Sequence, residues 1–247
     1  KEKSVDGEKS YEQIKQELQI QDLKRYGIYT CLIDEYSEIT EILEHLVNKF
    51  RRRTIFISGS AESYDSFTEE KGKELIANLS YALAKEGFNI VNGYGLGIGT
   101  YVINGVAKYC YSSDSGSTEQ INDILTLMPF PLENNNSESI HDFYSEYRKL
   151  MIKKCGISIF LFGNKGQDKI AEGVLEEYKI SKDLGLVALP IKSTGGASSI
   201  IFDDINKDDN SEEYLKALNF IEESTDEVDE LVESILKAVK ILNKEDS

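Results

Sequence analysis

Four glycines spaced two residues apart are the first candidates for chemistry in this chain. They are Gly93, Gly95, Gly97 and Gly99, in the stretch FNIVNGYGLGIGTYVINGV at residues 88–106. Glycine has no Cβ, so its backbone can take positive φ and a ligand can approach it closely. Anions bind where such a loop enters a helix, because free N–H groups and the helix dipole point at them. The pattern predicts a phosphate-binding loop that includes Leu96, although a tight turn without a ligand would show the same spacing.

Two apolar runs should position further loops beside this one. The runs TIFIS (residues 54–58) and ISIFLF (residues 157–162) are typical of buried strands, the second of a central strand covered on both faces. In open parallel sheets ligands bind at the carboxyl ends of the strands, where neighbouring loops converge. The residues that follow the two runs and are expected to face a ligand are Gly59, Ser60, Gly163, Asn164 and Lys165.

Charged side chains complete the predicted site. Arg148 lies beside an apolar stripe of a predicted helix at residues 140–154, and Gly173 and Glu177 belong to the helix that follows the second loop. The three charged residues also allow readings without a ligand contact. Arg148 could pair with an acidic neighbour on its own helix, Lys165 could be solvated surface, and Glu176 could face inward in place of Glu177. The site residues are predicted to bind a ligand and not to catalyse a reaction.

Composition excludes several classes of function. With 44 acidic and 28 basic residues the 247-residue chain has a formal net charge of -16, which argues against a nucleic-acid or anionic-membrane surface. A nucleotide would therefore need a local cluster of cations. The three cysteines (31, 110 and 155) and two histidines (45 and 141) show no metal-ligand spacing, so we expect no metal site and a reducing, cytoplasmic location. No apolar run approaches the roughly 18 residues of a membrane span.

The order of the elements predicts an α/β fold. Strands expected at residues 54–58, 88–91, 124–128, 157–162 and 186–191 alternate with helical patterns, which indicates a Rossmann-like open parallel sheet with helices on both faces. Residues 1–52 contain a helix, a β-rich run at 27–33 and a second helix, which is too little for a sheet. We expect them to be the tail of an upstream domain, and residues 53–247 to be the ligand-binding domain. The final helix, at 226–242, has an apolar stripe broad enough to cover a sheet face or a partner subunit.

Residues 53–192 resemble the SLOG superfamily, whose best-known enzymes are the LOG phosphoribohydrolases. The resemblance rests on TIFISGS, IVNGYGLGIGTYVINGVA, LMPFP, EYRKLMIKKCGISIFLFGN and GVLEE in that order. In LOG enzymes an arginine before a lysine and the last glutamate of a PGGxGTxxE loop carry the N-glycosidic chemistry, and Arg148 and Glu177 match them. Here residues 162–165 replace the PGG element, residues 165–172 contain an insertion, and Val174 stands for the threonine. These departures disfavour catalysis, although a LOG-type nucleoside 5′-monophosphate phosphoribohydrolase stays the alternative.

A subgroup of the superfamily, the C-terminal SLOG domain of Thoeris antiphage effectors, is more similar still. There a sirtuin-like domain that cleaves NAD precedes the SLOG domain, and residues 23–46 resemble the end of such a domain. The resemblance implies a sensor that binds a cyclic ADP-ribose isomer made by a TIR protein, with no cofactor in this chain and NAD as the substrate of the parent protein. It also implies that Arg148 and Lys165 meet the phosphates, that Glu177 meets a ribose hydroxyl, and that the protein is a homo-oligomer.

Overall fold

The structure, a computed structural model, divides the chain into two compact units, residues 1–44 and 45–247. It describes residues 10–28, 30–33, 35–65, 67–112, 118–131, 139–166, 169–205, 211–222 and 227–244. Among the helices in these ranges, none is both long and apolar enough to cross a membrane.

The first unit has helices but no strand among its described residues. It contains α1 (Tyr11–Arg25), which begins at a capping box between Ser10 and Gln13, and the first half of α2 (Ser37–Arg52). The β-rich run at 27–33 forms no strand at the residues described there, so this part of the predicted helix-strand-helix tail is wrong. An extended segment needs a partner strand for its N–H and C=O groups, and β propensity alone does not supply one. The predicted domain boundary at 52/53 stays a prediction.

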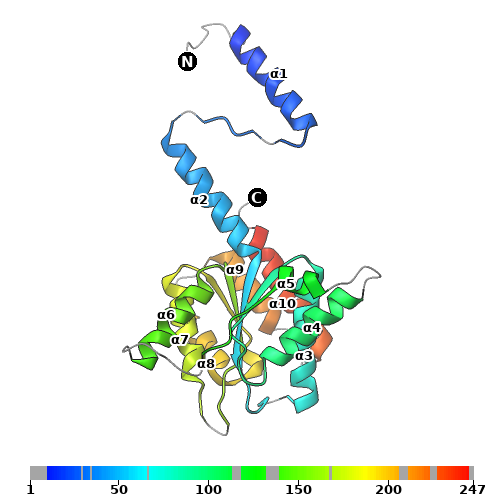
Figure 1. Cartoon of the computed structure of the whole chain (residues 1–247), viewed down its shortest axis with the longest axis vertical. Coiled ribbons are helices and arrows are strands. Elements are labelled where there is room, and N and C mark those ends of the chain that lie inside the picture. The colour runs from blue at the N-terminus through cyan, green and yellow to red at the C-terminus, as the bar shows by residue number, and fades with distance from the viewer. Residues whose placement is uncertain are drawn as a thin grey trace. The chain divides into compact units, whose positions relative to one another are not determined.

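The second unit contains a five-stranded parallel sheet, as the alternating sequence pattern predicts (Figure 1). The strands are β1 (Thr54–Ser60), β2 (Asn89–Asn92), β3 (Leu125–Leu127), β4 (Ile157–Phe162) and β5 (Val187–Pro190), in the order β3-β2-β1-β4-β5. This Rossmann-like order reverses direction between β1 and β4. Such a reversal is the usual place for a ligand in an open α/β sheet.

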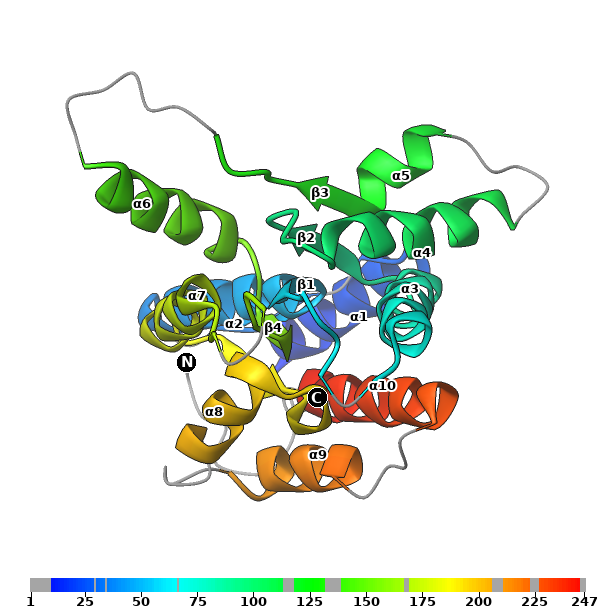
Figure 2. The same cartoon turned by 90° about the horizontal axis from the view of Figure 1, so that it is seen from below.

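Helices cover both faces of this sheet, and each face has its own core. The helices of the unit after α2 are α3 (Glu69–Lys85), α4 (Gly99–Tyr111), α5 (Thr118–Ile124), α6 (Ile140–Ile152), α7 (Glu172–Asp183), the 3-10 turn η1 (Lys192–Thr194), α8 (Gly196–Ile205), α9 (Glu212–Glu222) and α10 (Val228–Lys244). Figure 2 shows α3, α4 and α10 on one side of the sheet and α6 and α7 on the other. Ile55 and Ile57 of β1 belong to the larger core, whereas Phe56 packs with Met151 and Ile152 of α6.

The apolar stripe of α10 is used inside the unit. Val228, Leu231, Ile235, Val239 and Leu242 are all buried within the larger core. The sequence left two roles open for this stripe, covering a sheet face or contacting a partner subunit. In the structure it packs against its own domain.

Three helices of the second unit were not expected from the sequence: α5, α8 and α9. Gly195, directly before α8, and Gly196, its first residue, both have positive φ, and on sequence alone this stretch reads as a loop. Its continuation is nevertheless helical because Ala197, Ile201 and Phe202 are buried in the larger core. Tertiary packing outweighs weak local propensity at this position.

Candidate ligand-binding site

The crevice between β1 and β4 is filled by the protein itself. The backbone N–H groups of Gly163 and Asn164 both donate to the Ser60 carbonyl at 2.9 Å, and Ser60 Oγ donates to the Asn164 carbonyl at 3.1 Å. The Asn164 side chain accepts from the N–H groups of Glu62 (3.1 Å) and Ser63 (3.0 Å) and donates to the Ser63 carbonyl (2.7 Å). Ser60, Gly163 and Asn164 therefore hold the loops after the two strands together.

The glycine loop packs just as closely on its neighbours. A Cβ on Gly95 would lie 2.2 Å from the Gly59 carbonyl oxygen, and one on Gly97, whose φ is +68°, would lie 2.0 Å from that of Ala61. A Cβ on Gly59 would lie 2.4 Å from the carbonyl oxygen of Leu161. Glycine is thus required at these three positions because backbone carbonyl groups of the protein itself, and not a ligand, lie against them. Between the glycines, Ile98 is a core residue while Leu96 is 62% exposed.

A small pocket nevertheless remains beneath the glycine loop. Gly59, Gly93, Gly95 and Glu177, four of the residues predicted for the site, line it together with Phe130. Its volume is about 30 Å³. A cavity of that size holds a water molecule or two and no nucleotide.

Glu177, which lines this pocket, belongs to a partly buried charge cluster with Arg148 and Glu176. Arg148 Nη1 lies 2.8 Å from Glu176 Oε2, and Arg148 Nε lies 3.5 Å from Glu177 Oε1. The other carboxylate oxygen of Glu177 accepts a 2.6 Å hydrogen bond from Ser58 Oγ. A Cβ on Gly173 would lie 2.8 Å from Arg148 Nη2, so glycine there leaves room for the guanidinium. The alternative considered for Arg148, an ion pair with an acidic residue of its own helix, is not what the structure shows, because its ion-pair partners Glu176 and Glu177 are on α7.

This cluster is not electrostatically balanced. Burial raises the pKa of Glu177 to about 7, although the Ser58 hydrogen bond and the Arg148 charge both lower it. Arg148 Nε is buried and makes no hydrogen bond, although Glu177 Oε1 lies 3.5 Å away in an ion pair. One guanidinium thus faces two carboxylates, and part of its hydrogen-bonding capacity is unused. Unsatisfied buried polar groups of this kind often mark a functional site.

Phe130 closes the pocket, and no sequence signal identified it. Its ring lies 4.8 Å from Arg148 Cζ in a cation–π contact and packs edge-on against Tyr144 at 5.4 Å between centroids. The Tyr144 hydroxyl donates to the Pro131 carbonyl (2.9 Å), and that of Tyr147 donates to the Pro129 carbonyl (3.1 Å). Two tyrosines of α6 therefore hold the segment 129–131 so that its phenylalanine covers Arg148 and Glu177.

Lys165 and two residues of the glycine loop lie elsewhere at this edge. Lys165 is exposed, in a turn closed by its own N–H group, which donates to the Lys169 carbonyl at 2.7 Å. Residues 167 and 168 of the predicted insertion lie outside the described residues. Leu96 and Gly97 line a second cavity, of about 600 Å³, on the side of α3 and α4. The structure thus joins Arg148, Gly173 and Glu177 with Gly59, Gly93 and Gly95.

Comparison with known proteins identifies the family of this chain. The chain belongs to the Sir2- and TIR-associating SLOG family (STALD), whose family model matches residues 38–242. It is similar to the NAD(+) hydrolase ThsA of Enterococcus faecium, at 38% identity over 96% of this chain and 49% of that protein. It is likewise similar to the NAD(+) hydrolase ThsA of Bacillus cereus strain MSX-D12, at 36% identity over 93% of this chain and 48% of that protein. The chain spans about half the length of these relatives.

Proposed function

We propose that this chain is the regulatory sensor domain of an antiphage NAD+ hydrolase and that it binds a cyclic ADP-ribose isomer. The partly buried Arg148–Glu177 cluster, beneath a glycine loop at the carboxyl edge of the sheet, is the observation that supports the proposal best. The similarity to NAD(+) hydrolases that are about twice as long supports the same conclusion, because it leaves NAD cleavage to another part of the parent protein.

In this proposal the ligand takes over contacts that the protein now makes with itself. A phosphate accepts from Arg148 in place of the Glu176 carboxylate and uses the unsatisfied Nε. A ribose hydroxyl donates to Glu177, and Lys165 approaches the phosphates from the rim. Because the pocket of about 30 Å³ is far smaller than a nucleotide, Phe130 must leave Arg148 before the ligand can bind.

In this proposal the displacement of Phe130 transmits ligand binding to the rest of the protein. A ligand shifts a conformational equilibrium only by its difference in affinity for the two states, and the segment 129–131 contacts the pocket in the closed state. We further propose that the parent protein is a cytoplasmic homo-oligomer, that a TIR protein makes the ligand, and that binding activates NAD cleavage. Light scattering that gives the mass of one chain at all concentrations would contradict the assembly.

Calorimetric titration with cyclic ADP-ribose isomers, combined with chromatography of the mixture, tests the proposal. We expect saturable binding of at least one isomer, with the isomer recovered intact. Multiple-turnover release of adenine or of ribose 5-phosphate, from an isomer or from AMP, would instead favour a LOG-type phosphoribohydrolase. An absence of binding by every isomer would contradict the sensor.

A further inference from the structure

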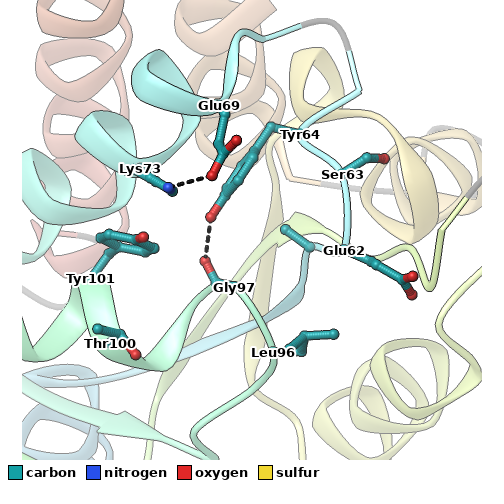
Figure 3. Close-up of a pocket in the computed structure, with 10 residues that line it drawn as sticks. Glu62, Ser63, Tyr64, Glu69, Lys73, Leu96, Gly97, Thr100 and Tyr101 are labelled. Atoms are coloured by element: carbon teal, nitrogen blue, oxygen red, sulfur yellow. Dashed lines mark hydrogen bonds and ion pairs between the residues drawn. The ribbon is translucent and has the colours of Figure 1, made fainter.

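The second cavity at the carboxyl edge is open and separate from the Arg148 pocket. Its volume is about 600 Å³, within the range of small-molecule sites. Its walls come from the loop after β1, the first turns of α3 and α4, and the glycine loop (Figure 3). None of the residues that line it also lines the pocket that contains Glu177. We refer to it as the α3–α4 cleft.

Hydrogen bonds and close packing hold the α3–α4 cleft open. The hydroxyl of Tyr64, a buried residue, donates to the Gly97 carbonyl at 2.9 Å, and the Ala61 N–H donates to the Leu96 carbonyl at 2.8 Å. The Tyr64 ring lies directly on Gly72, where a Cβ would come within 2.2 Å of it. The loop after β1 is therefore fixed to the glycine loop and packed on α3, so a ligand meets a site that is already formed.

The charges of the α3–α4 cleft do not favour a free phosphate. Lys73 forms an ion pair with Glu69, which lies one turn before it on α3, and its ammonium group lies 5.6 Å from the centre of the Tyr101 ring. The hydrogen bond with Glu69 raises the pKa of Lys73, so the lysine is charged, but the carboxylate beside it offsets that charge. Glu62 adds a second carboxylate, which points away from Lys73 in Figure 3. The lining thus has two carboxylates for one cation.

We infer that the α3–α4 cleft binds an uncharged nucleoside. The Tyr101 ring and the exposed Leu96 offer a surface on which a flat base can stack, as aromatic side chains do in nucleic-acid-binding proteins. The hydroxyl groups of Ser63 and Thr100 can bond the polar edge of the base. Glu62 can accept from the ribose hydroxyls, for which a carboxylate is a stronger acceptor than a neutral group. This site is additional to the one that carries the proposed function.

Titration of the whole chain with adenosine, followed by calorimetry, tests this inference. Replacing Tyr101 by alanine should weaken adenosine binding about tenfold or more, and Tyr101→Phe should retain most of it, because stacking depends on the ring. Leu96→Ser should also weaken binding, and since Leu96 is 62% exposed this variant should fold normally. Tyr109→Ala, on the same helix outside the cleft, is the matched control and should bind as the parent does.

Several results would overturn the inference. Among them are an absence of saturable adenosine binding at millimolar concentrations, equal binding by the parent and by both cleft variants, and binding of AMP at least tenfold tighter than that of adenosine. Free ribose that binds as well as adenosine would also contradict it, because the base would then contribute nothing. A cyclic ADP-ribose isomer should bind without displacing adenosine, and displacement would mean a single site. An isomer that fails to bind while adenosine binds would contradict the proposed function alone.

Discussion

The glycine loop borders two cavities, one of about 30 Å³ over Glu177 and one of about 600 Å³ beside α3 and α4. Both lie at the same edge of the sheet and share the same backbone. They differ in the side chains around them: Phe130, which contacts the Arg148 guanidinium, lines the small one, whereas Tyr64 and Lys73 of the large one are bonded to Gly97 and Glu69. A glycine-rich loop therefore does not by itself make a binding site, because its neighbours decide whether the space is filled.

The largest expected effect concerns the charge cluster that distinguishes the closed pocket. Arg148→Ala should lower the free energy of unfolding by about 3 kcal/mol, because it leaves the buried Glu177 and the neighbouring Glu176 without their cation. Lys149 follows Arg148 on the same helix and forms an exposed ion pair with Glu146. Lys149→Ala should therefore change the free energy of unfolding by less than about 1 kcal/mol. Urea unfolding followed by circular dichroism measures both. Equal losses in the two variants would mean that the cluster is no more important than a surface pair.

The next effect is the pH dependence of the same cluster. Burial raises the pKa of Glu177 from 4.5 to about 7, so between these values the folded chain binds a proton that the unfolded chain does not. The free energy of unfolding should therefore fall as pH rises through this window, on the order of 3 kcal/mol in all.

The Glu177→Gln variant should lack this decrease. Glu213→Gln, an exposed position on α9, controls for the loss of one carboxylate from an acidic chain. Urea midpoints measured at intervals from pH 4.5 to about 7.5 provide the comparison. A parallel pH profile in Glu177→Gln and the parent would show that Glu177 does not titrate in this range.

The smallest effect tests whether the exposed rim contributes to the closed pocket. Lys165→Ala should weaken binding of a cyclic ADP-ribose isomer by about 1.5 kcal/mol, the value of one hydrogen bond to a charged group. Lys169→Ala removes an equally exposed lysine from the same turn and should leave the affinity nearly unchanged. Similar losses of affinity in both variants, measured by calorimetry, would show that Lys165 adds only positive charge near the pocket and makes no specific contact with the phosphates.

The sequence was sufficient for the parallel sheet and for the convergence of several site residues. Strand identity follows from local apolar runs, and parallel strands bring their carboxyl ends to one edge, which is why Gly59, Gly93 and Glu177 could be placed together in advance. Phe130 and Tyr64 could not be predicted, because what they do depends on contacts with residues distant in the sequence. The run at 27–33 misled for the same reason, since a strand depends on a partner.

The two glutamates of α7 show the limit most clearly. Sequence spacing could not decide whether Glu176 or Glu177 faces the site, and in the structure both contact Arg148. Only Glu177 also lines the pocket and bonds Ser58. The distinction depends on how α7 is rotated about its own axis where it packs on β1 and β4, and local sequence patterns do not specify that rotation.

A crystal structure of the whole chain with a saturating cyclic ADP-ribose isomer would show where the ligand binds and whether Phe130 moves. We expect the ligand to lie against Arg148 and Glu177, the Phe130 ring to have left the guanidinium, and the α3–α4 cleft not to contain the ligand. A ligand bound in the α3–α4 cleft, with Phe130 still at about 4.8 Å from Arg148 Cζ, would mean that the Arg148 pocket is not the sensor site.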